Sequence, residues 1–331
     1  MEDLRGKKIF VGLSGGVDSA VSAALLKRAG ADVTGVFIKG WYPPGMPCTW
    51  AAERRDAMRV AARLQIPFLT LDASAEYKKS VIDYLLAEYR AGRTPNPDVL
   101  CNRDVKFGAF YRFAKANGAA AIATGHYRAG EKDQSYFLWA VPKAILAETV
   151  FPVGTMQKTK VREYAKRLGI PVASKKDSQG VCFLGPVSID EFLRAEFGTH
   201  PGPAVDASGA PVGTHTGVLL STLGERVALR GAKDGPWFVI AKDITLNTLV
   251  VAKTRAPGGE RGARIRFKDA NWHGTPDTVT TAQMRYRGPH IAGRVEDGVF
   301  IASEPLPEPP VPGQSIVFYA GGALSGGGVI E

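Results

Sequence analysis

The fold of this 331-residue chain is decided by one stretch near its start, Lys8-Ile9-Phe10-Val11-Gly12-Leu13-Ser14-Gly15-Gly16-Val17-Asp18-Ser19. The first six residues form a short apolar run that predicts a strand, and apolar residues recur at helical spacing from Asp18 to Ala29. The glycines between them let the backbone approach an anion and turn its amides toward it at the helix N-terminus. The stretch therefore predicts a strand, a phosphate-binding turn and a helix.

The turn differs from two common nucleotide-binding motifs. It lacks the Gly-Lys-Ser/Thr of a Walker A loop, and it is not GxGxxG, which disfavours a nicotinamide cofactor. Without the Walker lysine, γ-phosphate transfer is disfavoured, whereas Asp18 suits a magnesium ion that holds a pyrophosphate. An N-cap serine with a tight turn gives a similar short string, but the full Ser-Gly-Gly-x-Asp-Ser pattern between strand and helix favours phosphate binding.

The first half of the chain alternates strand and helix patterns. Further strands are expected at 32–38, 67–71 and 119–124, and helices at about 51–64 and 75–90. This alternation predicts an α/β fold with a doubly wound parallel sheet, whose ligand lies outside the carboxyl ends of the strands.

After about residue 200 glycine and proline become frequent, and short alternating runs predict two small β-rich domains. We expect a catalytic domain over 1–198, a central β domain over 199–258 and a C-terminal β-barrel over 259–331. Strands are expected at 217–221, 237–241, 249–252, 265–267, 283–287, 299–302 and 315–319.

Composition narrows the class of protein. Hydrophobic residues make up 45% and charged residues 22%, which excludes a disordered or fibrous chain, and no apolar run is long enough for a membrane helix. The start of the chain is too polar for a signal peptide, so we expect a cytoplasmic protein.

The net charge of +10 lies in residues 1–195, which contain 29 basic and 19 acidic residues, whereas residues 196–331 contain 13 of each. This asymmetry fits a polyanionic partner or a charge that only aids solubility.

Three cysteines and five histidines show no zinc-ligand spacing, so no structural metal is expected. Cys101 follows Arg93-Thr94-Pro95-Asn96-Pro97-Asp98, where two prolines predict a stiff loop rather than a helix. Cys182 also lies in a basic, glycine-containing loop. Single thiols are either buried small hydrophobic residues or reactive groups, and burial is the default. Neither thiol follows a core periodicity, however, and the cations near Cys101 would lower its pKa, which favours a reactive, accessible group.

Seven motifs, in order along the chain, resemble the tRNA-specific 2-thiouridylase family, which belongs to the PP-loop ATP pyrophosphatases. They are SGGVDSA, GRTPNPDVLCN, ATGHY, KDQSYFL, FPVG, KDSQGVCF and the terminal PGQSIVFY…GGGVIE. The resemblance implies a sulfurtransferase that uses ATP, with Mg²⁺, to adenylate the C2 oxygen of a wobble uridine in tRNA. It also implies a persulfide sulfur-donor protein as a second partner. We expect the enzyme to be a monomer without a membrane association.

The resemblance also implies roles for individual residues. Cys182 would carry a persulfide that replaces the oxygen, Cys101 would release that sulfur and close a transient disulfide with Cys182, and Asp98 would exchange protons with the uracil. The expected ATP contacts are Gly12, Leu13, Ser14, Gly15, Gly16, Val17, Asp18, Ser19, Ile38 and Gly125. The expected contacts with tRNA or its target base are Asn96, Pro97, Asp98, Lys132, Asp133, Gln134, Arg285 and Tyr286. Cys48 has no expected role.

Two features depart from the family pattern. Only residues 128–131 separate ATGHY from KDQSYFL, where the family carries a longer hairpin, and Glu225 replaces the glutamine of a Thr-x-Gly-Gln-Arg motif. Four alternatives also stay open. His126 fits a structural histidine as well as a pocket residue, and Arg285-Tyr286-Arg287 is also typical of a solvated strand face. The whole chain could instead be an ATP pyrophosphatase that needs no thiol pair and that adenylates a small molecule, or a tRNA base for amination. It could also be an RNA-binding protein whose nucleotide site is degenerate.

Overall fold

The computed structural model describes residues 4–46, 48–176, 187–255, 259–260 and 262–331. Its contacts divide the chain into two compact units. The first unit contains residues 1–82 and 98–187, and the second contains residues 83–97 and 188–331. The expected boundaries after residues 198 and 258 stay predictions.

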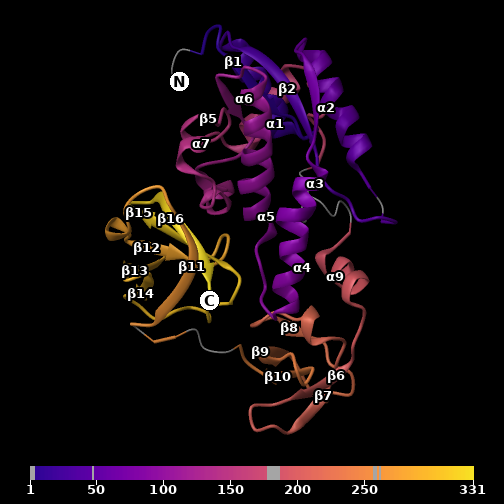
Figure 1. Cartoon of the computed structure of the whole chain (residues 1–331), viewed down its shortest axis with the longest axis vertical. Coiled ribbons are helices and arrows are strands. Elements are labelled where there is room, and N and C mark those ends of the chain that lie inside the picture. The colour runs from indigo at the N-terminus through magenta and orange to yellow at the C-terminus, as the bar shows by residue number, and fades with distance from the viewer. Residues whose placement is uncertain (1–3, 47, 177–186, 256–258, 261) are drawn as a thin grey trace. The chain divides into compact units, whose positions relative to one another are not determined.

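A five-stranded parallel sheet with the order β3-β2-β1-β4-β5 forms the centre of the first unit (Figure 1). The strand order reverses at β1, which pairs with β2 on one side and with β4 on the other. In α/β proteins ligands bind at such a switch point, outside the carboxyl ends of the strands. The strands are β1 (Lys8–Gly12), β2 (Asp32–Lys39), β3 (Phe68–Asp72), β4 (Ala121–Ala123) and β5 (Thr149–Val150). The predicted doubly wound α/β class is confirmed.

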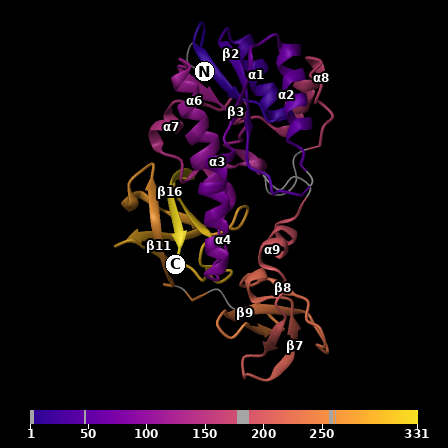
Figure 2. The same cartoon turned by 45° about the vertical axis from the view of Figure 1, so that its right-hand side comes forward.

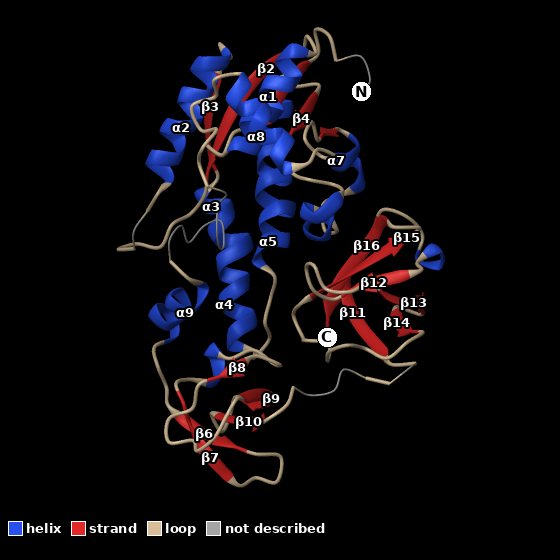
Figure 3. Ribbon diagram, turned by 180° about the vertical axis from the view of Figure 1, so that it is seen from behind, coloured by secondary structure: helices blue, strands red, loops and turns tan. Residues whose placement is uncertain are grey.

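Helices cover both faces of this sheet. Helices α1 (Val17–Arg28), α2 (Trp50–Leu64) and α8 (Lys158–Arg167) lie over one face (Figure 3), and α6 (Phe110–Ala116) lies over the other. Small buried residues such as Ala20, Ala23 and Ala24 let α1 pack closely on the sheet. The remaining helical segments of this unit are α3 (Ser74–Tyr77), α5 (Pro97–Leu100), α7 (Lys143–Ala147), the π-helices Lys78–Ile82 and Cys101–Ala109, and the 3₁₀ turns Gly130–Lys132 and Ser135–Leu138.

The segment before Cys101 was expected to be a stiff loop; residues 93–96 do lie outside any helix or strand, but the expectation is wrong from Pro97 onward. Pro97 is the first residue of α5, so Asp98 lies in a helical turn, and a nine-residue π-helix begins at Cys101. Proline is favoured at the first helical position because its missing N–H has no partner there in any helix.

The second unit begins with α4 (Asp83–Arg90), which continues the helical run of α3, and resumes with α9 (Ile189–Phe197). The latter starts with a capping box in which Ser188 and Glu191 satisfy each other's backbone amides. A five-stranded sheet follows in the order β7-β6-β10-β9-β8. Its strands are β6 (Gly202–Val205), β7 (Pro211–His215), β8 (Arg226–Val227), β9 (Trp237–Asp243) and β10 (Thr248–Ala252). The strand expected at 217–221 is instead a 3₁₀ turn, Val218–Leu220.

Six strands then close a barrel in the order β11-β14-β13-β12-β15-β16, shown in orange to yellow in Figure 2. The strands are β11 (Arg264–Trp272), β12 (Thr281–Gln283), β13 (Ile291–Glu296), β14 (Val299–Ala302), β15 (Ser315–Ala320) and β16 (Ala323–Ile330), with a 3₁₀ turn at Pro276–Thr278. The strand expected at 283–287 ends at Gln283, so Arg285 and Tyr286 lie in the connection to β13. No helix in the described ranges is long and apolar enough to cross a membrane.

An aromatic cluster fills the barrel around Phe318, which is fully buried. Its ring stacks on Trp272 at 5.2 Å between centroids and contacts Phe267 at 4.9 Å. We expect Phe318→Ala to lower the free energy of unfolding of the barrel by about 3–5 kcal/mol, because it leaves a cavity that these rings cannot fill. Chemical denaturation monitored by tryptophan fluorescence measures the change. Leu246→Ala is the control, since Leu246 is 69% exposed and its loss should change little.

Candidate functional site

The turn between β1 and α1 is shaped by its two serines. The Ser14 and Ser19 hydroxyls lie 3.3 Å apart, the Gly16 amide donates to Ser14 Oγ, and Ser19 Oγ donates to the Gly16 carbonyl. Gly15 has φ +74°, and a Cβ there would lie 2.5 Å from the Glu53 carbonyl oxygen of α2. Only glycine fits at this position, and the helix starts after Gly16 without a side-chain cap. The first-turn amides thus lack the internal acceptor that an N-cap side chain supplies elsewhere.

Asp18, in the first turn of α1, is held by two residues distant in sequence. Lys158 Nζ at the start of α8 lies 2.6 and 2.7 Å from the two carboxylate oxygens, and the Tyr127 hydroxyl donates to Oδ1 at 2.7 Å. The Lys158 side chain is only 14% exposed, so this ion pair is partly shielded from water. Lys158 of α8 therefore places a positive charge beside the turn between β1 and α1, which contains no lysine of its own.

A second lysine fastens the other side of the turn. Lys175 Nζ donates to the Gly15 carbonyl at 3.1 Å and pairs with Asp56 of α2 at 2.8 Å. The sequence analysis missed both Lys158 and Lys175 as site residues. Lys158 follows the FPVG motif by four positions and Lys175 precedes KDSQGVCF, so the motifs gave the only available signal.

The carboxyl end of β4 packs directly on this turn through Gly125. A Cβ at Gly125 would lie 2.7 Å from the Ser19 amide nitrogen, so the close backbone contact requires glycine. Beyond β1, the side chain of Ile38 lies near Gly12, since a Cβ built on Gly12 would be 4.0 Å from Ile38 Cδ1. The structure thus brings the residues expected to bind ATP together at the ends of β1, β2 and β4; their role in binding ATP stays a prediction.

His126 follows Gly125 and is held as a neutral ring. Its Nδ1 lies 3.0 Å from Thr124 Oγ1, and its ring packs on Phe107 at 5.4 Å between centroids. Burial lowers the pKa of His126 to about 3, and the positive charge of Lys106 adds to that effect. The imidazole therefore carries no charge at neutral pH.

Asp98 and Cys101 begin the helical run that leads to Phe107. Burial raises the pKa of the Asp98 carboxyl, against the opposing charge of Lys106, which suits a group that takes up and releases protons. The expectation of an accessible Cys101 is wrong for this structure, because the residue is 1% exposed. Its place at the start of a helix explains the burial that the sequence analysis missed.

The pairing expected between the two thiols rests on a residue that lies outside the described part of the chain, Cys182. Cys48 is exposed and has no assigned role. Beside Cys101, Asn102 is buried; its Nδ2 donates to the Phe137 carbonyl, and its Oδ1 has no partner among the described residues. Asp98, Cys101 and Asn102 thus lie within one continuous helical stretch.

The shortened segment 128–131 folds as a tight turn. The Arg128 amide donates to the Gly154 carbonyl at 2.7 Å, and Gly130 has φ +76°. Gln134 then folds back on Tyr127, since the Tyr127 amide donates to Gln134 Oε1 and the Gln134 amide donates to the Tyr127 carbonyl. Asp133 accepts from the Ser135 amide, and Lys132 ends the 3₁₀ turn. The three expected tRNA contacts thus lie on one short segment.

The remaining expected tRNA contacts belong to the second unit. Arg285 pairs with Glu308 at 2.7 Å, and the Arg287 guanidinium lies 5.1 Å from the centre of the Tyr286 ring. Asn96 is half-buried and Pro97 is buried. The departure at Glu225 has a local explanation, since its Oε2 accepts the Thr222 amide at 2.9 Å.

Comparisons with known proteins agree over the whole chain. Residues 7–186 match the family described as the tRNA methyl transferase HUP domain, and residues 190–253 match the tRNA methyl transferase PRC-barrel domain. The chain is 41% identical over 364 residues to the tRNA-specific 2-thiouridylase MnmA of Hahella chejuensis, covering 100% of this chain and 99% of the relative. It is also 41% identical over 358 residues to the MnmA of Thiobacillus denitrificans, covering 98% and 99%.

Solved structures match part of the chain. A 4-thiouridine synthetase in complex with RNA and bound ATP is 25% identical, with a TM-score of 0.37, over 55% of this chain and 46% of that chain. The U34-tRNA thiolase NcsA of Methanococcus maripaludis, with its [4Fe-4S] cluster, is 18% identical, with a TM-score of 0.39, over 58% and 68%.

The neutral state of His126 gives a direct prediction. Because its pKa lies near 3, its ring resonances should not titrate between pH 5 and 8. The unfolded chain protonates this imidazole below pH 6.5 and the folded chain does not, so its contribution to stability is complete above pH 6.5 and is lost toward pH 3. Two-dimensional NMR of the histidine rings measures the titration, and chemical denaturation between pH 3 and 7 measures the change in stability. A titration of His126 near pH 6.5 would contradict its assignment as a neutral ring.

Proposed function

This chain belongs to the tRNA-specific 2-thiouridylase family, and on that basis we propose that it thiolates the wobble uridine of tRNA at C2, consuming ATP and releasing AMP and diphosphate. The motif resemblance is therefore confirmed at the level of the family. The observation that carries the proposal is the glycine-shaped turn beside the Asp18–Lys158 ion pair, because it can hold a triphosphate without a Walker lysine.

In the first step, the uracil O2 attacks the α-phosphorus of ATP and diphosphate leaves with the electron pair of the broken P–O bond. Asp98 takes up the N3 proton of the base, a role that its raised pKa supports. The turn amides and Lys158 hold the negative charge of the departing diphosphate. The C2 oxygen has then become part of AMP, which is a good leaving group.

Mg²⁺ fits this site through Asp18. No group of three or more His, Cys, Asp or Glu side chains that could bind a metal occurs in the described segments. Mg²⁺ commonly uses one or two carboxylates together with substrate phosphates, and Asp18 supplies such a carboxylate beside the turn. When bound, the ion would neutralise charge on the phosphates.

In the second step, the terminal sulfur of a Cys182 persulfide, loaded by a donor protein, attacks C2 and expels AMP. The Cys101 thiolate then attacks Cys182 Sγ, and the broken S–S bond leaves its electrons on the sulfur now attached to C2. The products are 2-thiouridine and a Cys101–Cys182 disulfide, which an external thiol reduces. Because Cys101 is 1% exposed, this step requires a conformational change that exposes its thiol.

The tRNA contacts of the proposal are Asn96, Pro97, Lys132, Asp133, Gln134, Arg285 and Tyr286. We propose that the protein acts as a monomer. A second candidate function, adenylation without a thiol pair, is favoured by one observation, the burial of Cys101. The two candidates differ in their dependence on cysteine.

Cys101→Ser tests this difference. We expect it to lower formation of 2-thiouridine by about 100-fold or more, because serine cannot release the sulfur, while diphosphate release and tRNA binding persist. Mass analysis of nucleosides from tRNA incubated with enzyme, ATP and a sulfide source measures 2-thiouridine. The mass change also distinguishes replacement of oxygen by sulfur from methylation, the activity in the description of the matching family. Cys48→Ser is the matched control and should keep full activity. Unchanged thiolation in Cys101→Ser would refute the role assigned to Cys101. Equal diphosphate release in the wild-type protein and in Cys101→Ser, without any 2-thiouridine from either, would instead support the thiol-independent candidate.

Lys158→Met tests the phosphate site. We expect tRNA-dependent diphosphate release to fall by about 100-fold, because the leaving group loses its cation. Lys115→Met is the matched control, since Lys115 also pairs with a carboxylate of the first unit, Glu148, but is 38% exposed. Equal rates of diphosphate release in the two variants would show that Lys158 is not part of the phosphate site.

A further inference from the structure

The backbone just before Asp98 is fastened by the C-terminal barrel. Gln314, which directly precedes β15, donates from Nε2 to the Thr94 carbonyl at 2.7 Å and lies 3.4 Å from the Pro95 carbonyl. In return, the Thr94 amide donates to the Pro312 carbonyl at 3.0 Å. Both Thr94 and Pro95 are buried, so these polar backbone groups depend on the barrel for their partners.

The contact is so close that it requires glycine at position 313. Gly313 has φ +91°, and a Cβ there would lie 3.0 Å from both the nitrogen and the oxygen of Thr94. The two stretches of backbone therefore meet directly, and the Gln314 side chain reaches past this point to the next carbonyl. Residues 312–314 act as a strap over residues 94–95.

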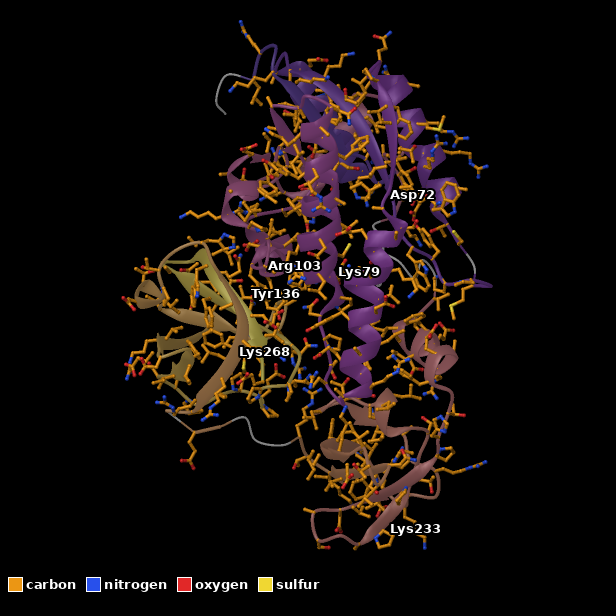
Figure 4. The ribbon with its side chains drawn as sticks, viewed as in Figure 1. Asp72, Lys79, Arg103, Tyr136, Lys233 and Lys268 are labelled. Atoms are coloured by element: carbon orange, nitrogen blue, oxygen red, sulfur yellow. The ribbon has the colours of Figure 1, made fainter. Side chains whose placement is uncertain are left out.

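The other end of the fastened segment is fixed as well. Arg93 makes a two-pronged ion pair with buried Glu88 of α4, at 2.6 and 2.5 Å, and Thr94 Oγ1 lies 3.3 Å from Thr222 Oγ1. The hydrogen bonds from Arg93 lower the pKa of Glu88, and the positive charge of Lys268 on β11 lowers it further (Figure 4). Lys268 makes the smallest of these contributions, so the Arg93 ion pair is what fixes this end of the segment.

The fastened segment ends two residues before α5 begins. Asn96 and Pro97 follow without a break, so the position of Thr94 and Pro95 sets where Pro97 begins α5. We propose that Gln314 is a positioning residue for the substrate residues Asn96 and Pro97, acting through the carbonyls of Thr94 and Pro95. This inference rests on the proposed function. Gln314 touches no reacting atom, and its amide is suited to the task because its two N–H groups can serve two carbonyls.

Two variants of Gln314 test the proposal in the full chain. Gln314→Ala removes the donor, and Gln314→Glu keeps the shape but turns an acceptor toward two carbonyl oxygens. We expect hydrogen exchange at the Thr94 amide to speed up about five- to tenfold in Gln314→Ala and more in Gln314→Glu, since the segment loses one net hydrogen bond. The single-turnover rate of thiolation should fall roughly tenfold while the Kd for tRNA stays unchanged, because misplacement affects chemistry rather than binding.

Asp277→Asn is the control, as Asp277 is an exposed barrel residue outside the strap, and it should leave exchange and rate unchanged. Unchanged exchange at Thr94 overturns the proposal. So does faster exchange with an unchanged rate, and so does a rate loss that follows weaker tRNA binding. The exchange measurement needs neither ATP nor tRNA. Absence of 2-thiouridine with the wild-type protein would therefore count against the proposed function, and it is distinguishable from failure of the strap.

Discussion

Backbone packed on backbone, with no side chain between, is the constraint on which the site depends. The turn after β1 is confined on one side by the Glu53 carbonyl, which excludes any Cβ at Gly15, and on the other by Gly125, whose α-carbon lies against the Ser19 amide. Such contacts hold the turn amides in place without a capping side chain. The polar partners then come from elsewhere, with Lys158 and Tyr127 on Asp18 and Lys175 on Gly15. Preorganised donors of this kind stabilise charge without reorganising during the reaction.

The sequence predicts the first unit well because local patterns and topology agree there. The β1–α1 stretch combines an apolar run, a glycine turn and helical spacing, and each of these is a local signal. Strand β5 was missed because it is two residues long. The helix at Pro97 was missed because proline was read as a helix breaker, although at the first helical position it is favoured.

The barrel and the cations of the site show where sequence reasoning fails. Strand β16 contains Gly326, Gly327 and Gly328, which give no strand pattern, yet a Cβ at Gly328 would lie 2.7 Å from the Phe267 ring. Glycine at this position leaves space for the aromatic core of the barrel. That requirement comes from tertiary packing, so it cannot be seen in the local sequence. Lys158 and Asp18 form an ion pair although they are 140 positions apart in the sequence, and no local sequence pattern predicts such a contact. The tRNA-facing residues stay predictions from the family.

The π-helix that begins at Cys101 has a consequence for how that thiol leaves the core. A π turn holds about one residue more than an α turn, so converting one π turn to an α turn rotates the residues at the N-terminal end of this helix by about 100° around the helix axis relative to the rest of the helix. Phe107 and Phe110 are fully buried and would anchor the far end during such a change. A register shift of this kind would swing Cys101 from the interior to the surface while the helix stays intact, so the sulfur could be uncovered without local melting.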